Sequence, residues 1–146
     1  MKRHHSLCII ISVLLLLVFV SCKKSSNKNS SITIANISGT YKLSALIWVS
    51  GGLTFNVYDS LPACEKDNEI QLNTDLSANY IDAGITCNPP ENSTGNWYLS
   101  ADSLYLNTTP SKIKSFDGTT LVITGYPNNG GVIDSTVIGT TTLTKI

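Results

Sequence analysis

The chain has 146 residues, with ten basic and ten acidic side chains and a formal charge of zero. The charge is uneven, because residues 37–146 hold all ten acids, five lysines and no arginine, and are therefore near −5. Nucleic-acid binding requires clustered cations against phosphates, so this composition argues against that function class. About 110 residues remain beyond position 36, which suits one domain with a modest core.

The first 21 residues have the pattern of an export signal. Lys2 and Arg3 precede an apolar run from Leu7 to Val20, which is 14 residues long. A transmembrane helix needs about 20 apolar residues, so this run is short for a membrane span. A charged start followed by an apolar core of about 7–15 residues and a small residue is typical of a secretory signal peptide. We therefore expect residues 1–21 to be removed.

The apolar run ends in Phe19-Val20-Ser21-Cys22, which resembles the lipobox of bacterial lipoproteins, with Phe where Leu is commoner. In that family the Cys thiol is linked to diacylglycerol and becomes the new, acylated amino terminus. The resemblance implies that Cys22 is the lipidation site and that the membrane is a partner through this lipid. A plain signal peptide, or an uncleaved anchor helix with an incidental Cys, is the alternative interpretation.

Residues 22–36 are rich in Lys, Ser and Asn and begin with no apolar residue to bury, so they predict a disordered polar tether. Asp does not follow Cys22, and an acidic cluster close behind it is also missing. By the rule known for enteric lipoproteins, the first absence favours the outer membrane over the inner one. We expect an anchored cell-envelope protein of a Gram-negative bacterium, in the outer membrane and facing the periplasm.

Two cysteines remain after the signal and the lipid site, Cys64 and Cys87. In an oxidising envelope an isolated pair usually forms a disulfide, which would close a loop of about 24 residues. A metal pair or a redox couple is the alternative. Metal binding needs further ligands, yet no His follows His5, and redox couples usually lie two residues apart.

Beyond Ser30 no stretch has a convincing helical apolar stripe, and short runs rich in Thr, Ile, Val, Tyr and Leu alternate with Gly, Asn, Asp and Pro. These runs predict an all-β chain whose short links favour an antiparallel up-and-down β-barrel of eight or nine strands. Asp117-Gly118 is a typical hairpin link, because Gly adopts positive φ without steric cost. The expected strands are 39–49, 53–59, 68–73, 77–83, 94–100, 103–108, 111–116, 119–125 and 132–145.

Residues 37–146 resemble the small lipocalin-like domains of Gram-negative lipoproteins. The motifs that carry the resemblance are Gly39-Thr40-Tyr41, Cys64-Glu65-Lys66-Asp67-Asn68, Gly95-Asn96-Trp97-Tyr98-Leu99, Leu104-Tyr105-Leu106, Leu121-Val122-Ile123 and Leu143-Thr144-Lys145. Two positions depart from the pattern of that family. Tyr41 stands where it usually has Trp, and Lys145 stands where larger relatives often place an Arg against that Trp. The closing contact at the base of the barrel therefore depends on these two residues.

The resemblance implies a barrel that holds a small apolar ligand, since an eight-stranded barrel has room for one. Period-2 alternation selects a candidate interior set: Leu43, Ala45, Ile47, Ile70, Leu72, Tyr80, Trp97, Leu99, Leu104, Leu106, Leu121 and Ile123. These side chains either fill a solid core or line a ligand cavity. The remaining aromatic residues either form a rim for sugars or peptides or cover the outer sheet: Trp48, Tyr58, Tyr98, Tyr105 and Tyr126.

Catalysis is not expected, because a chain without His after the signal has no Ser-His-Asp or Cys-His arrangement. Glu65, Asp67 and Glu69 form a local acidic cluster, which either binds Ca²⁺ weakly or is a solvated edge. We expect no metal, no cofactor and a monomer. Two functions stay open: a carrier of a small hydrophobic molecule, and an interaction or inhibitor module that contacts an envelope protein through the loop 88–93.

Overall fold

The computed structural model describes residues 30–129 and 132–146. This part of the chain is mostly β-structure, with three single-turn helices, α2 (Ile34–Ile37), α3 (Val57–Ser60) and α4 (Ala63–Lys66). None of the helices described in it is long and apolar enough to cross a membrane. The strands are β1 (Gly39–Ser50), β2 (Leu53–Asn56), β3 (Glu69–Leu72), β4 (Ser77–Ile81), β5 (Ser93–Ser100), β6 (Ser103–Leu106), β7 (Thr109–Phe116), β8 (Thr120–Gly125), β9 (Asn128–Asn129), β10 (Val132–Ile133) and β11 (Val137–Lys145).

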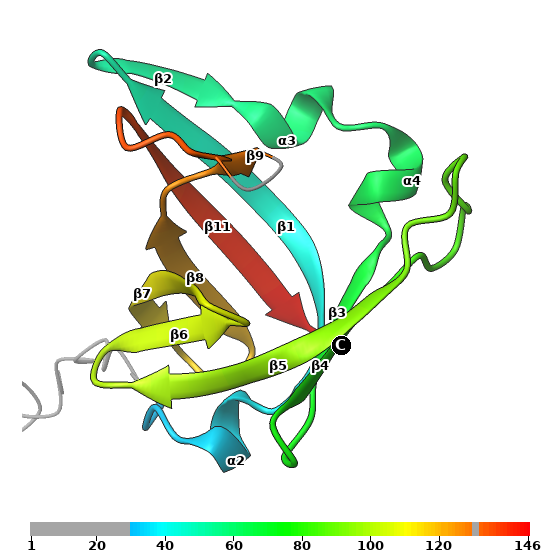
Figure 1. Ribbon diagram of the computed structural model, residues 1–146, viewed down its shortest axis with the longest axis vertical. Helices are drawn as coiled ribbons and strands as arrows, with labels where there is room; N and C mark the ends of the chain where they lie inside the picture. The colour runs from blue at the N-terminus through cyan, green and yellow to red at the C-terminus, as the bar shows by residue number, and fades with distance from the viewer. Residues whose placement is uncertain (1–29, 130–131) are drawn as a thin grey trace, which may run out of the picture.

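Eight of these strands form a closed antiparallel barrel (Figure 1). The order is β1, β3, β4, β5, β6, β7, β8 and β11, and β11 pairs with β1 to close the ring. Closure removes the exposed sheet edges that an open meander of this size would carry. The predicted all-β, antiparallel up-and-down barrel is confirmed, with β2 as one extra strand.

Strand β1 is long enough to have two partners on one side. Its first four residues pair with β3, whereas Ile47–Ser50 pair with β2. The two glycines that link β1 to β2, Gly51 and Gly52, have φ of 57° and 80°. Positive φ at both central residues is typical of the two-residue hairpin turn that matches the strand twist. Strand β2 therefore extends the wall of the barrel at one end only.

Two predicted strands are interrupted in the structure. The run 53–59 ends as a strand at Asn56, whose side-chain amide donates to Asp59 Oδ2 (2.7 Å) at the start of α3. The run 132–145 contains a turn, in which Asp134 Oδ1 accepts from the backbone N–H and the hydroxyl of Thr136. Short polar side chains offer the backbone local partners in place of ladder hydrogen bonds, which ends a strand.

The core lies at one end of the barrel, which we call the base, and α2 covers this end (Figure 1). Tyr41 and Trp97 are fully buried there, and the Trp97 indole N–H donates to the carbonyl of Asn73 (2.8 Å). Ile37, at the end of α2, is also fully buried in this core. The largest fully buried side chains are Trp97, Tyr41, Phe116, Ile37, Leu72, Leu104, Leu121 and Leu143.

Residues 30–36, which precede the predicted domain boundary at residue 37, contact the barrel. The backbone N–H of Ser30 donates to the carbonyl of Phe116 (2.8 Å), and the Thr33 hydroxyl accepts from Asn36 N (3.2 Å) and caps α2. Residues 30–36 are thus part of the fold instead of a disordered tether, because the segment carries Ile37 into the core. The predicted signal and the lipidation site Cys22 lie outside the described residues.

A β-bulge in β1 reverses the predicted orientation of two side chains. Leu43 pairs with Leu143, but Ala45 pairs with Thr142, so Ser44 is the extra residue. An extra residue shifts the alternation, and the side chains beyond it exchange faces. Leu46 and Trp48 therefore face the interior opposite Thr141 and Gly139. The prediction that Ala45 and Ile47 face the interior is wrong, because both lie beyond the bulge and point outward.

Candidate functional site

The interior of the barrel changes from large to small side chains along its length. Near the base, β8 and β11 contribute Leu121, Ile123 and Leu143 to the core. Two to four residues further from the base, the same inner faces carry Thr141, Gly139 and Gly125. Their side chains are too small to fill this end of the barrel. We call this open end, opposite α2, the mouth.

A hollow of about 210 Å³ lies in the mouth against β1, β8 and β11. Trp48 and Leu46 line it from β1, and the small side chains of the neighbouring strands leave its volume open. Its lining combines the apolar side chains of Leu46 and Trp48 with the hydroxyl groups of Ser111, Tyr126 and Thr141. The lining residues are Leu46, Trp48, Ser111, Gly125, Tyr126, Pro127, Gly139 and Thr141. We call it the Trp48 hollow.

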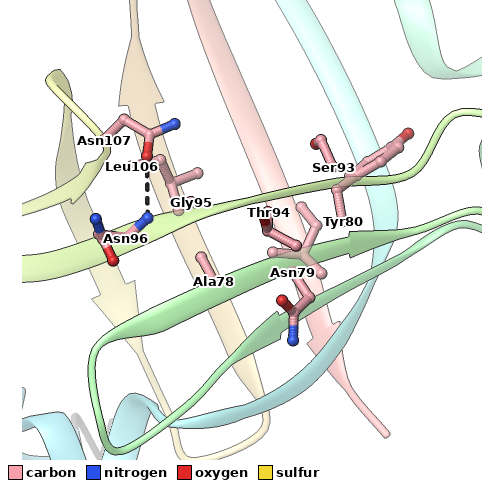
Figure 2. A pocket seen from close by; sticks show the side chains of 10 residues that line it. Ala78, Asn79, Tyr80, Ser93, Thr94, Gly95, Asn96, Leu106 and Asn107 are labelled. Carbon is pink, nitrogen blue, oxygen red and sulfur yellow. Dashed lines mark hydrogen bonds between the residues drawn. The ribbon is translucent and has the colours of Figure 1, made fainter.

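A second hollow, of about 130 Å³, lies against the opposite wall, where β4 pairs with β5 (Figure 2). Gly95 leaves space on this wall, and the side chain of Asn107 lies there, with Oδ1 accepting from Asn96 N (2.9 Å). A Cβ at position 95 would collide with this amide. Tyr80, Ile70 and Leu106 contribute the apolar part of the lining. We call it the Tyr80 hollow.

The hairpin of β1 and β2 continues the inner face of the barrel beyond the mouth. Phe55 pairs with Trp48 and Leu53 pairs with Ser50, so both apolar side chains share the face of the Trp48 hollow. Leu53 is 64% exposed and Phe55 is 48% exposed. Exposed apolar residues beside a cavity are typical of a ligand-binding or protein-binding surface.

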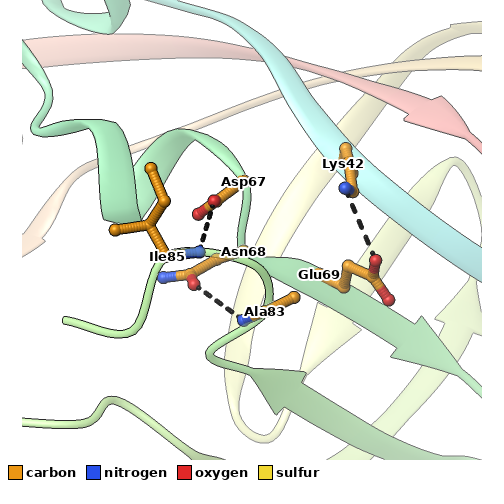
Figure 3. A network of polar contacts seen from close by, with 6 residues as sticks. All are labelled: Lys42, Asp67, Asn68, Glu69, Ala83 and Ile85. Atoms are coloured by element: carbon orange, nitrogen blue, oxygen red, sulfur yellow. Dashed lines mark hydrogen bonds and ion pairs between the residues drawn. The ribbon is translucent and has the colours of Figure 1, made fainter.

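The rim of the mouth is cross-linked by the Cys64–Cys87 disulfide, which confirms the predicted bridge. It joins α4 to the loop 82–92. Asp67 Oδ2 accepts from Ile85 N (2.7 Å), and Asn68 Oδ1 accepts from Ala83 N (3.3 Å), which attach the same loop to the start of β3 (Figure 3). The Cys-x-Lys-Asp element therefore fixes the loop at the rim.

Negative charge surrounds Tyr80 at this rim. Burial raises the pKa of Tyr80, the hydrogen bond from Asn68 lowers it, and the charges of Glu91, Glu65 and Asp82 raise it. Asp82 itself is held by the loop, since its carboxylate accepts from Cys87 N (3.1 Å) and from Glu91 N (3.0 Å). Three acidic side chains therefore lie near Tyr80 at this side of the mouth.

The predicted acidic cluster does not converge. Glu69 pairs with Lys42 (Nζ to Oε1, 3.6 Å), whereas Asp67 is engaged with the loop (Figure 3). Within residues 30–129 and 132–146, no group of three or more His, Cys, Asp or Glu side chains is arranged to hold a metal ion. The Lys66 ammonium donates to the carbonyl of Asp59 (3.1 Å) and ties α4 to α3.

The candidate interior residues divide between base and mouth. Leu72, Trp97, Leu104, Leu121 and Ile123 are buried in the core. A second group is partly buried against it: Leu43, Ile70, Leu99 and Leu106. Period-2 alternation missed further residues that face the interior. Some of them lie beside bulges in β1 and β7, and the sequence analysis gave others a different role. The missed residues are Tyr41, Leu46, Trp48, Ile113, Phe116 and Leu143.

The aromatic residues outside this set also divide. Trp48 and Tyr126 line the mouth, as a rim would require. Tyr98 and Tyr105 instead stack on the outer face of β5 and β6, with ring centroids 4.5 Å apart. The Tyr58 ring lies in α3, 5.3 Å from the Lys66 ammonium. One continuous aromatic rim is therefore not formed.

A family model described as the lipocalin-like domain matches residues 37–123, which is more than half of the chain. The chain belongs to the lipocalin-like domain family. No curated protein and no solved structure matches it. The match covers β1 to β7 and the start of β8, and it contains the whole lining of the Tyr80 hollow. Five residues that line the Trp48 hollow lie beyond it: Gly125, Tyr126, Pro127, Gly139 and Thr141.

Proposed function

We propose that this lipocalin-like protein is a lipid-anchored envelope protein that binds a small, uncharged, apolar molecule at the mouth of its barrel. The observation that carries the proposal is the Trp48 hollow, which opens beside the exposed Phe55 and Leu53. We assign the protein no catalytic role. The ligand is bound by apolar contact, and the hydroxyls of Ser111 and Thr141 offer hydrogen bonds to a polar group on it.

The lining chemistry favours a ligand without negative charge. The residues that line the Trp48 and Tyr80 hollows include no Lys, Arg, Asp or Glu. An anion in such a site would lose its hydration without gaining a cation as partner. The acids around Tyr80 add repulsion at the entrance. Fatty acids are therefore poorer candidates than neutral apolar molecules.

The size of the hollows favours a small ligand or one that protrudes. Their volumes of about 210 and 130 Å³ are below the roughly 300 Å³ at which typical ligand pockets begin. A longer molecule would continue along the inner face of the β1–β2 hairpin, over Phe55 and Leu53. The candidate interior residues were expected either to fill a solid core or to line a ligand cavity. Both interpretations apply, because the base is a packed core and the mouth is hollow.

The anchor rests on the sequence around Cys22, which lies outside the described residues. The Cys64–Cys87 disulfide supports placement in an oxidising compartment such as the periplasm. We propose a monomer at the outer membrane. Growth of cells with radiolabelled palmitate tests the anchor: wild-type protein incorporates the label and Cys22→Ser does not. Equal labelling of the two would contradict it.

Ligand binding is tested with two naphthylamine probes that differ in charge. The purified protein should bind neutral phenylnaphthylamine, with quenching of Trp48 fluorescence, at least tenfold more tightly than anionic anilinonaphthalene sulfonate. A Cβ at Gly139 meets only ordinary contacts, 3.5 Å from Gly125 O and from Trp48 Cδ1, so Gly139→Leu fits and fills the hollow. We expect it to weaken binding at least tenfold.

Thr140→Leu is the matched control, because residue 140 adds the same side chain on the outer face of the same strand. It should leave binding of the neutral probe unchanged. Equal loss in both variants, or no binding by the wild type, would contradict a ligand site in the mouth.

A groove of about 370 Å³ favours the second function, an interaction module. It is lined by Asn79, Tyr80, Ile81, Asn92, Ser93 and Thr94, beside the cross-linked loop. Amides and hydroxyls of this kind hydrogen-bond to a peptide backbone. If neutral probes do not bind but an envelope partner is retained by the wild type and lost when residues 88–93 are shortened, this function replaces the carrier.

A further inference from the structure

Exposed isoleucines gather at the base of the barrel, on the side away from the core. Ile32 and Ile34 flank the start of α2 and are 42% and 38% exposed. Ile146 is 63% exposed, and its N–H donates to the carbonyl of Thr40 at the start of β1 (2.9 Å). Ile37, one turn along α2, points into the core instead. The segment therefore buries Ile37 and exposes Ile32 and Ile34 beside the polar residues Ser31, Thr33 and Asn36.

The first residue that the structure describes, Ser30, lies at this same end. Ser30 joins the fold beside Phe116 at the base, and its hydroxyl lies next to Gly118 in the turn between β7 and β8. Seven residues lie between Cys22 and Ser30, so the chain takes eight steps from one to the other. Fully extended, they span at most about 28 Å. An acyl group on Cys22 would therefore hold the base close to the bilayer.

The mouth is the competing apolar end, since Leu53 and Phe55 are also exposed. It lies at the far end of β1, whose 12 residues have a contour of about 36 Å at 3.3 Å per residue. Because barrel strands are tilted by about 35–45°, the mouth is roughly 27 Å from the base along the barrel axis, and it would reach the bilayer only with the chain between Cys22 and Ser30 almost fully extended. The position of the anchor thus favours contact of the bilayer with the base over contact with the mouth.

The geometry points to a membrane-docking surface made of Ile32, Ile34 and Ile146, which rests on the lipid surface and directs the ligand mouth away from it. This inference depends on the proposed lipid anchor. Its occupant is the bilayer itself, because an acylated chain brings these side chains to the interface and apolar side chains gain free energy on leaving water there.

Both positive and negative side chains lie at the base, so net charge does not attract it to a membrane. The contact with the bilayer therefore depends on the apolar side chains. Lys145 lies over Tyr41 at this end, and the turns between β3 and β4 and between β7 and β8 carry Asp75 and Asp117. These acids oppose an anionic surface. We expect docking on zwitterionic phosphatidylcholine, without a requirement for anionic lipid.

The test uses the full chain, isolated from the membrane fraction and reconstituted in phosphatidylcholine vesicles that contain doxyl-labelled lipid. Tryptophan is placed at either end, as Ile34→Trp or Leu53→Trp, each with Trp48→Phe, so that Trp97 is the shared background. The inference predicts quenching of the Ile34→Trp protein at least twofold greater than that of the Leu53→Trp protein. Adding Ile32→Asp should reduce this quenching, while flotation with the vesicles persists.

Val49→Asp is the matched control, since it places the same charge on an exposed apolar residue of β1 near the mouth. It should leave the quenching of the Ile34→Trp protein unchanged. Equal or greater quenching of the Leu53→Trp protein, in a chain whose acylation is verified by mass spectrometry, would overturn the docking surface alone. Absence of the acyl group would overturn the anchor and the docking surface together.

Discussion

The ammonium of Lys145 lies 5.7 Å from the ring centroid of Tyr41 and donates to the carbonyl of Asn36 (2.9 Å). The last strand thus contacts both the first strand and α2. The Tyr41 hydroxyl donates to the carbonyl of Ile37, so Tyr41 and Lys145 both bind the last residues of α2. Tyr41 and Lys145 stand where the lipocalin-like pattern has Trp and Arg, and from the sequence this departure put the closing contact in question. The geometry shows that Lys145 and Tyr41 do contact each other at the base.

Removal of the Lys145 ammonium should reduce the stability of the fold at the base of the barrel. Lys145→Ala loses a cation–π contact of about 0.5–1 kcal/mol and a hydrogen bond of about 1 kcal/mol. We expect the free energy of unfolding to fall by about 1–2 kcal/mol in urea titration. Lys145→Arg should retain most of it, and Lys114→Ala, which removes an exposed lysine of β7, should change little. An equal loss in Lys145→Ala and Lys114→Ala would contradict the contact.

Gly39 is required by the same arrangement. Its φ is +150°, and a Cβ there would collide with Cε of Lys145. We expect Gly39→Ala to reduce stability by about 1–3 kcal/mol, the usual cost of a strained backbone conformation. The double variant Gly39→Ala/Lys145→Ala separates the two causes. If the collision contributes, the double variant loses less stability than the sum of the single ones, whereas exact additivity would assign the whole loss to the backbone.

Ionisation of Tyr41 should make the folded protein less stable at alkaline pH. Burial raises the pKa of Tyr41 from 10.0 to about 12. The folded-state pKa exceeds the unfolded value, so this contribution is complete below pH 10 and is lost as the pH rises through 12. A shift of this size corresponds to about 2–3 kcal/mol. The measurement is the urea midpoint as a function of pH, with tyrosinate absorbance recorded in parallel.

Tyr41→Phe is the variant that isolates this effect. It should be less stable at neutral pH, because the Ile37 carbonyl loses its donor, but it should lack the alkaline loss due to residue 41. Tyr80 also has a raised pKa, so Tyr80→Phe is measured as the comparison. An unchanged alkaline profile in Tyr41→Phe would refute the assignment to Tyr41.

The disulfide should contribute to global stability. Cys64 and Cys87 are 23 residues apart, and closing a loop of this length stabilises the fold by about 3 kcal/mol in the chain-entropy model. The double variant Cys64→Ser/Cys87→Ser should lose about this amount in urea titration and become insensitive to reducing agent. Wild-type protein should lose a similar amount on reduction. Insensitivity of the wild type to reductant would show that the bridge does not support the fold.

Most of the core residues at the base could be predicted from the sequence, because apolar residues alternate with polar ones along their strands and this alternation shows which side chains face the interior. Leu121 and Ile123, or Trp97 and Leu99, are two apart in uninterrupted strands, and each of these residues is buried or partly buried in the core. The mouth was less predictable. Its hollows arise from Gly139, Gly125 and Gly95, and a glycine in a strand does not reveal whether its empty face points inward.

The sequence by itself determined the strand periodicity, the hairpin turns and the pairing of the two remaining cysteines, because each depends on short-range chemistry. Only the tertiary structure decided that Ser44 is the bulge that sends Trp48 inward and Ile47 outward. Where a strand holds one residue more than its partner is set by its neighbours, here β11, which lies about 100 positions further along the chain. The wall of the candidate ligand site therefore follows from closure of the barrel, which no single segment of the chain encodes.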